Sequence, residues 1–324
     1  MQNYPKRMRE RRKNQKIRDK YSETSLSPAD FIFPIFIKED TEKKEPIKSM
    51  PGHFRYSLND IDEIIRKCEK AGILGILLFG MPSKKDATGS EAWNDEGIVQ
   101  RAIKKIKRIS RLTVFADVCL CQYTSHGHCG FLEKGRIDND KTLKLLSRIA
   151  LSYAKAGGDY VCPSAMMDFQ VSAIRKAIDM AGFRNVKIMS YSAKFASNFY
   201  GPFREAVGSS PKTGPKDRKT YQMDFRNSEE ALKEIELDTK EGAEIVMVKP
   251  SLAYLDIISK AKEKFGKYKV PIAAYNVSGE YAMLKAAGDE FLYESLIGIK
   301  RAGADIIISY AALEILDQKW LKKG

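Results

Sequence analysis

The chain has 324 residues and a formal net charge of +14, with 56 Lys or Arg against 42 Asp or Glu. Its hydrophobic share of 43% is ordinary for a globular protein, and it contains no apolar run of about 18 residues, so a membrane-spanning helix is not expected. The N-terminus lacks the apolar core of a signal peptide, and the five cysteines cannot all pair in disulfides. These features predict a soluble, cytoplasmic protein with free thiols.

Much of the excess positive charge lies at the start of the chain. Residues 1–20 hold nine Lys or Arg against Glu10 and Asp19, and they lack the apolar period of a packed element. An arm of this kind can bind phosphates or hold a neighbouring subunit. We predict that residues 1–25 form a basic inter-subunit arm and that residues 26–324 form one catalytic domain.

The rest of the chain alternates short apolar runs with longer segments of helical period, which is typical of βαβ units. Helices are predicted between these runs. One example is residues 57–71, which begin with Ser57 and Asp60 in capping-box spacing, and another is residues 140–157, which end at a pair of glycines. Eight such units favour a (β/α)8 barrel over a doubly wound sheet, because no glycine-rich phosphate-binding turn occurs. The predicted strands are residues 31–37, 73–79, 113–120, 160–163, 187–192, 245–248, 272–277 and 306–310.

The loop after the third predicted strand, residues 117–130, contains three of the five cysteines and two of the three histidines. Thiolates and imidazoles favour zinc over cations that prefer oxygen ligands. A set of Cys119, Cys121 and Cys129 with an open fourth position is typical of a catalytic zinc site, with His126 and His128 nearby. A buried thiol cluster or a redox pair are the alternative interpretations.

Reactive side chains follow six of the predicted strands, and the C-terminal ends of barrel strands meet at one mouth. Two of these side chains are lysines after strongly apolar runs. Burial lowers the pKa of an amine and leaves it neutral, as Schiff-base formation with a ketone requires. For either lysine alone, an ion pair with a carboxylate at the barrel rim is the alternative. The residues are Cys119 and Cys121, Ser164, Lys194, Lys249, Ser278 and Tyr310.

The sequence resembles the porphobilinogen synthase family, also called the 5-aminolevulinate dehydratases, over nearly its whole length. In addition to the cysteine loop, the resemblance rests on eight short segments. They are Leu26-Ser-Pro-Ala-Asp30, Ser49-Met-Pro-Gly-His-Phe-Arg-Tyr56, Leu78-Phe-Gly-Met-Pro82, Met189-Ser-Tyr-Ser-Ala-Lys-Phe-Ala-Ser197, Phe199-Tyr-Gly-Pro-Phe-Arg204, Asp217-Arg-Lys-Thr-Tyr-Gln222, Met247-Val-Lys-Pro250 and Val277-Ser-Gly-Glu280.

The resemblance implies that two 5-aminolevulinate molecules condense to porphobilinogen, with loss of two waters, on a (β/α)8 barrel that assembles as a homo-octamer. It implies that Lys249 forms an imine with the substrate that supplies the propionate side, that Lys194 binds the second substrate, and that Asp117 is a candidate proton shuttle. The remaining implied substrate-binding residues are Ser278 and Tyr310 for the first carboxylate, Arg204 and Lys219 for the second, and Tyr200, Gln222 and Ser164 as assisting groups.

The resemblance also implies the metals. The three cysteines place the chain in the zinc-dependent class, in which zinc acts as a Lewis acid. Some family members bind magnesium outside the active site through a glutamate that aligns with Glu234, for which a solvated helix face is the alternative. Ala165 and Phe169 stand where the family usually has Asp and Gly, and the first of these changes removes a carboxylate from the strand-end loop that contains Ser164.

Two other functions fit part of the sequence. Another Schiff-base enzyme on the same barrel, such as a class I aldolase, would explain Lys249 but leaves the cysteine loop and the second lysine unexplained. A zinc-dependent nucleic-acid-binding protein would use the basic arm, but Leu120, Tyr123 and Thr124 bring no positive charge to the cysteine loop. We therefore predict a homo-oligomeric enzyme with no nucleic-acid or membrane partner.

Overall fold

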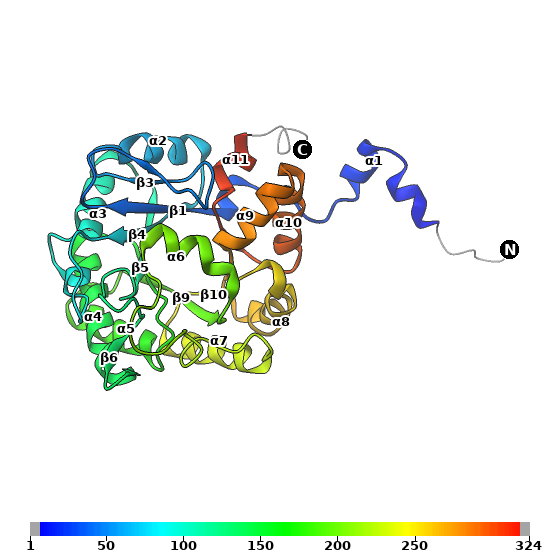
Figure 1. The fold of residues 1–324 in the computed structure, drawn as a ribbon. Helices are drawn as coiled ribbons and strands as arrows, with labels where there is room; N and C mark the ends of the chain where they lie inside the picture. The colour runs from blue at the N-terminus through cyan, green and yellow to red at the C-terminus, as the bar shows by residue number, and fades with distance from the viewer. Residues whose placement is uncertain (1–6, 318–324) are drawn as a thin grey trace.

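A closed ring of parallel strands surrounded by helices forms the body of the protein (Figure 1). The computed structural model describes residues 7–317. The barrel strands pair in sequence order, and the last pairs with the first, which closes the ring and confirms the predicted (β/α)8 barrel. The strands are β1 (Phe31–Lys38), β4 (Gly75–Met81), β5 (Thr113–Val118), β8 (Tyr160–Pro163), β9 (Lys187–Lys194), β10 (Ile245–Lys249), β11 (Ile272–Asn276) and β12 (Ile306–Ser309).

Each of the eight predicted strands is present, with small differences at the ends. The strands β9 and β10 continue to Lys194 and Lys249, so both lysines are the last residues of strands, whereas the predicted strands ended before them. Their pairing has a register shift: Val246 pairs with Ser190, whereas Val248 pairs with Ala193. One extra residue of β9 therefore bulges out in this interval.

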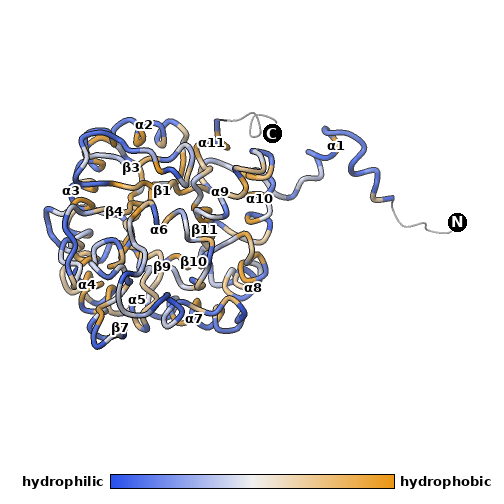
Figure 2. The backbone as a smooth tube through the Cα atoms, viewed as in Figure 1, coloured by the Kyte–Doolittle hydropathy of each residue, from blue (hydrophilic) through white to orange (hydrophobic). Residues whose placement is uncertain are grey.

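The helices cover the outside of the barrel, and their apolar faces turn towards the strands (Figure 2). The first of them starts later than predicted, because the Ser57 hydroxyl accepts a hydrogen bond from the backbone N–H of Asp60 at 3.1 Å and holds the preceding residues in a turn. The helices are α2 (Ile61–Ala71), α3 (Ile98–Ile109), α4 (Asn139–Ala156), α5 (Gln170–Met180), α7 (Glu229–Glu241), α8 (Leu255–Phe265), α9 (Ser278–Ala287), α10 (Asp289–Arg301) and α11 (Ala312–Asp317).

Several short helices and strands lie outside the barrel strands and the main helices, and none of them was predicted from the sequence. The most important is α6 (Gly201–Val207), which follows β9 and lies across the front of the barrel in Figure 1. The others are β2 (Glu45–Pro46), β3 (Phe54–Tyr56), β6 (Phe131–Glu133), β7 (Arg136–Asp138), η2 (Pro28–Asp30), η3 (Ser90–Trp93), η4 (Asn198–Tyr200), η5 (Leu252–Tyr254) and η6 (Gly266–Tyr268).

The N-terminal segment projects away from the barrel (Figure 1). It contains η1 (Met8–Arg12) and α1 (Gln15–Lys20), and neither contains a buried residue. Residues 1–6 of the predicted arm and residues 318–324 of the predicted catalytic domain lie outside the described residues. The role of the arm between subunits stays a prediction. No helix in the described part of the chain combines the length and apolarity needed to cross a bilayer.

Candidate functional site

The two predicted lysines lie side by side at the mouth of the barrel. Lys194 and Lys249 are register partners at the ends of β9 and β10, and each is only 6% exposed. The Nζ of Lys249 lies 4.2 Å from the ring centre of Tyr275 and 4.8 Å from that of Tyr191, and Lys194 Nζ lies 5.5 Å from the Tyr191 ring. Both amines therefore share one aromatic chamber, whose ring faces attract a cation.

The environment of Lys249 makes its amine reactive. Burial, together with the positive charge of Lys194, lowers the pKa of Lys249 to about 7. A substantial fraction of this amine is thus neutral near pH 7, which is the form that attacks a carbonyl carbon. Lys194 instead donates a hydrogen bond to the backbone carbonyl of Ser164, which fixes the position of its amine.

Asp117 lies on β5 and is fully enclosed beside the lysines. One carboxylate oxygen accepts a hydrogen bond from the Gln122 side chain at 3.0 Å, and the other has no partner among the described residues. Burial raises the pKa of Asp117, while Gln122 and the charge of Lys194 act in the opposite direction. A carboxyl group with a raised pKa and a free oxygen can take up or release a proton inside the chamber.

The three predicted cysteines form one buried cluster. The Sγ atoms of Cys119 and Cys121 are 3.5 Å apart, and the ligand atoms of all three residues, including Cys129, lie within 4.8 Å of one another. Within residues 7–317, this is the only group of three or more Cys, His, Asp or Glu that could hold a metal ion. Hydrogen bonds from the other two thiols hold the pKa of Cys129 well below its usual value. Three sulfur donors with an open fourth position fit zinc.

Both histidines of the cysteine loop use their ring nitrogens within the protein. The His126 ring contacts the Ala87 carbonyl at 3.2 Å and accepts from the His128 backbone N–H at 3.1 Å. The His128 ring contacts the Tyr221 hydroxyl at 3.0 Å and the Pro215 carbonyl at 3.1 Å. These contacts give both histidines a role in ordering the loop.

The segment 195–222, which we call the lid, covers the mouth and carries four predicted residues. Arg204 on α6 is partly buried, and its Nε has no partner among the described residues. Gln222 is 3% exposed, and both polar atoms of its side chain also lack a partner in this part of the chain. The Tyr200 hydroxyl is engaged, because it donates to the carbonyls of Phe195 and Lys249.

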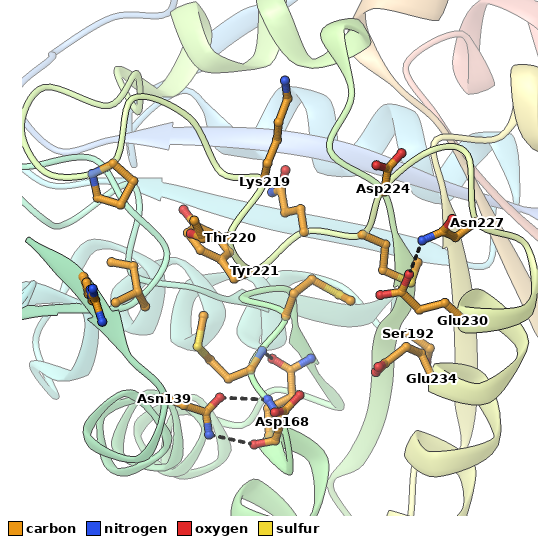
Figure 3. A pocket seen from close by; sticks show the side chains of 18 of the residues that line it. Asn139, Asp168, Ser192, Lys219, Thr220, Tyr221, Asp224, Asn227, Glu230 and Glu234 are labelled. Atoms are coloured by element: carbon orange, nitrogen blue, oxygen red, sulfur yellow. Dashed lines mark hydrogen bonds between the residues drawn. The ribbon is translucent and has the colours of Figure 1, made fainter.

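Lys219 is the most exposed of the four predicted lid residues. Its side chain is 72% exposed and 3.7 Å from the carboxylate of Asp217. In Figure 3 the Lys219 side chain points away from Glu234 and Ser192. Lys219 would therefore need a movement of its side chain or of the lid to meet a substrate in the chamber.

The remaining predicted residues line the other strand ends. The Ser278 hydroxyl, at the start of α9, accepts a hydrogen bond from the Phe203 backbone N–H at 2.9 Å. The Tyr310 hydroxyl lies 3.1 Å from the hydroxyl of Tyr275, whose ring is part of the aromatic chamber around Lys249. The backbone carbonyl of Ser164 accepts the hydrogen bond from Lys194, and its side chain lies near enough to Asp117 to lower the pKa of that carboxyl. All three are buried, as groups that fix a substrate inside the barrel must be.

A separate cavity of about 840 Å³ opens beside the lid, with Gln222, Ser192 and Glu234 in its walls, but neither Lys194 nor Lys249 lines it (Figure 3). Glu234 belongs to α7, and burial together with the charges of Asp238 and Asp168 raises the pKa of Glu234 to about 7. Because the lysines lie outside this cavity, we place the chemistry in the aromatic chamber and not here.

Sequence reasoning missed four residues that shape the site. Tyr191 and Tyr275 supply the ring faces around the lysines, and their place in apolar strand runs gave no sign of it. Arg218 and Tyr221 hold the lid against the cysteine loop. Both lie in the quoted Asp-Arg-Lys-Thr-Tyr-Gln segment, so the motif was a usable signal.

The sequence and the fold of this chain are similar to those of known proteins. The family described as "Delta-aminolevulinic acid dehydratase" matches residues 5–318. The chain is 55% identical to the delta-aminolevulinic acid dehydratase of Methanothermus sociabilis, covering 96% of this chain and 98% of that protein, and 54% identical to that of Methanothermobacter thermautotrophicus, covering 96% of each. A crystal structure of the Toxoplasma gondii delta-aminolevulinic acid dehydratase (porphobilinogen synthase), in complex with the reaction product porphobilinogen, covers 99% of this chain and 95% of that chain with 41% identity and a TM-score of 0.93. The chain belongs to the delta-aminolevulinic acid dehydratase family.

Proposed function

We propose that Lys249 and Lys194 form imines with the two substrate molecules in the reaction of this enzyme. The chain is a hydro-lyase with porphobilinogen synthase activity, which condenses two molecules of 5-aminolevulinate to porphobilinogen with loss of two waters. The observation that carries the assignment of residues is the register pairing of the two lysines in one aromatic chamber. Two carbonyl substrates held on neighbouring strands meet without the entropy cost of a free encounter.

The first chemical step falls to Lys249. Its neutral amine attacks the ketone carbon of the first 5-aminolevulinate, the carbonyl oxygen leaves as water, and a carbon–nitrogen double bond forms. The protonated imine then withdraws electrons from the neighbouring carbon, which makes proton removal there easier. Lys194 binds the second substrate in the same way. Asp117, with its free carboxylate oxygen, is the group in reach for proton transfer.

The carboxylate groups of the substrates supply orientation. Ser278 and Tyr310, buried at the ends of β11 and β12, are placed to hold the first carboxylate beside Lys249. Arg204, with its unpartnered Nε, is placed to hold the second, and Lys219 joins it when the lid closes. Gln222 offers an unpartnered amide at the same mouth, whereas the hydroxyl of Tyr200 supports the lid backbone.

Cys119, Cys121 and Cys129 would hold zinc through three thiolates. When bound there, zinc would supply Lewis-acid chemistry to the second substrate. The protein's own contribution is the shape of the cluster, the buried surroundings of the thiols, and the loop contacts made by His126 and His128.

Three wider features belong to the same proposal. Magnesium at Glu234 is supported by the raised pKa of its carboxyl in an acidic setting, which a cation would relieve. A homo-octamer is supported by the projecting N-terminal segment, whose exposed surface lacks a barrel contact to bury it. A cytoplasmic location agrees with five free cysteines, because zinc binding needs reduced thiols.

Borohydride trapping tests the central claim. The enzyme is incubated with 5-aminolevulinate, the imines are reduced with borohydride, and the labelled peptides are mapped. We expect covalent label on Lys249 and, at higher substrate concentration, on Lys194. The exposed Lys219 is the internal control and should stay unlabelled. Absence of label from Lys249 in an active preparation would refute the assignment.

A further inference from the structure

We propose that Glu280 is a positioning residue that sets the distance between Lys249 and Ser278, the two groups proposed to hold the first substrate. This inference rests on the proposed function, because it takes Lys249 as the imine-forming amine and Ser278 as a group that binds the first carboxylate. Glu280 belongs to α9 and has no part in the chemistry assigned above. Its carboxylate instead joins the two strand ends from which those groups project.

The Glu280 carboxylate holds the loop that follows Lys249. Glu280 is 0% exposed, and its Oε1 accepts a hydrogen bond from the Leu252 backbone N–H at 2.8 Å. Its Oε2 accepts from the Ser251 hydroxyl at 3.3 Å. Ser251 and Leu252 follow closely after Lys249, which is the last residue of β10. The place of Lys249 relative to α9 therefore depends on this carboxylate.

The same carboxylate holds the turn that leads into Ser278. Its Oε2 also accepts from the Val277 backbone N–H at 3.0 Å and from the Asn276 side-chain amide at 3.3 Å. Asn276 is the last residue of β11, and Ser278 is the first residue of α9. Glu280 thus joins the C-terminal ends of the neighbouring strands β10 and β11 at the mouth of the barrel.

The lid rests on the same region. The Ser278 hydroxyl accepts a hydrogen bond from the Phe203 backbone N–H at 2.9 Å, and the Phe203 ring centre lies 5.3 Å from the Nζ of Lys249. A Cβ at Gly279 would stand 2.5 Å from the Phe199 carbonyl oxygen, so the lid backbone packs directly against the start of α9. The lid therefore contacts both of the groups whose separation the carboxylate sets.

The chemistry of the substrate makes this separation important. In 5-aminolevulinate a short chain of methylene groups joins the ketone carbon to the carboxylate. An imine on Lys249 and a hydrogen bond from Ser278 can form together only at a distance that this chain spans. A buried carboxylate that accepts several hydrogen bonds has few alternative positions, so Glu280 holds that distance firmly. A misplacement of about 1 Å at a reacting group can lower a rate about 100-fold.

Two substitutions in this network and a matched control test the inference. Glu280→Gln keeps the size of the side chain but replaces one acceptor oxygen by a donor, which then faces another donor. Ser251→Ala leaves the carboxylate in place and removes one of its donors, so it also serves if Glu280→Gln does not fold. Asp305→Asn is the control, because Asp305 accepts from the Ile272 backbone N–H at 2.9 Å and joins β11 to β12 at the opposite end of the barrel.

The readouts are the melting temperature and the 5-aminolevulinate concentration that gives half-maximal borohydride-trapped label at each lysine. In Glu280→Gln we expect this concentration to rise about tenfold for Lys249 and to stay unchanged for Lys194, which lies on β9 outside the network. In Ser251→Ala we expect a rise of about 2- to 5-fold, at Lys249 alone. Asp305→Asn should lower the melting temperature and leave both concentrations unchanged.

Each contrary result has its own meaning. An unchanged concentration for Lys249 in both network variants would overturn the inference, because Glu280 would then only stabilise the fold. An equal rise at Lys249 and Lys194 would also overturn it, because a general loosening of the chamber would explain the result. Absence of label at Lys249 in the active, unmodified enzyme would overturn the imine assignment and this inference together, so the two failures are distinguishable.

Discussion

The two halves of the active site are built by different means. The lysine half lies on adjacent strands, where backbone pairing fixes Lys194 beside Lys249. The metal half lies in loops, where Arg218, His128 and Tyr221 hold the cysteine loop against the lid through side chains. The groups proposed for covalent chemistry therefore have positions set by backbone pairing in the barrel, whereas the position of the cysteine loop depends on side-chain contacts with the lid. This division suits an enzyme that must open to bind two substrates.

The largest effect should come from a substitution in the lysine half. Lys249→Met removes the nucleophile, and we expect pyrrole formation to fall by about 10⁴-fold or more, the scale of losing a covalent group. The melting temperature should not fall, because the substitution also removes a costly buried charge. Lys176→Met on the barrel surface is the control. Retention of near-normal turnover by Lys249→Met would break the assignment of this half.

The metal half should respond to chelation in a graded and reversible way. Removal of zinc should lower pyrrole formation by about 100-fold or more, and added zinc should restore it. Cys121→Ser should mimic chelation, whereas Cys68→Ala, which alters a buried thiol outside the cluster, should leave zinc affinity unchanged. Steady-state assays at known zinc activity measure both effects. Full activity in metal-free enzyme would show that the cysteines have no catalytic part.

A pH series separates the two halves further. The pKa of Lys249 is lowered to about 7, so its reactive neutral form is depleted by protonation below that value. The rate of borohydride-trapped labelling at Lys249 should rise about tenfold per pH unit below pH 7 and level off above it. In the Lys194→Met variant the inflection should move to higher pH, because the second positive charge has gone. If the inflection in the unmodified enzyme lies near the ordinary pKa of lysine, the proposed effect of the chamber on Lys249 is wrong.

The smallest effect should come from the backbone contact between loop and lid. Gly127→Ala forces a residue with a Cβ into a left-handed conformation, at a cost of about 1–2 kcal/mol, and crowds the Ser210 carbonyl. We expect trypsin cleavage after Lys212 to rise about 5- to 30-fold, while the melting temperature of the barrel changes little. Gly135→Ala, also at positive φ but with open space around it, controls for backbone strain alone. A matching fall in barrel stability would show that the two halves are not independent.

The sequence was informative wherever the signal was local. Apolar runs predicted all eight barrel strands, because each is buried on both faces and reads as a continuous hydrophobic segment. The cysteine cluster was predicted because its ligands are close in the chain. The aromatic chamber and the Arg218 contacts were not, since they join strands or loops that are distant in sequence. The short elements such as α6 carry too little periodicity to stand out.

The irregular pairing of β9 and β10 has a consequence for how this site can vary. Tyr191 and Lys194 are three residues apart on β9, and in a regular strand an odd separation sends two side chains to opposite faces. The extra residue between the partners of Val246 and Val248 changes that parity, so both side chains meet Lys249 inside the barrel. Loss of one residue here would turn Lys194 outward, towards the helices. The length of this strand therefore matters as much to the proposed imine chemistry as the amines themselves.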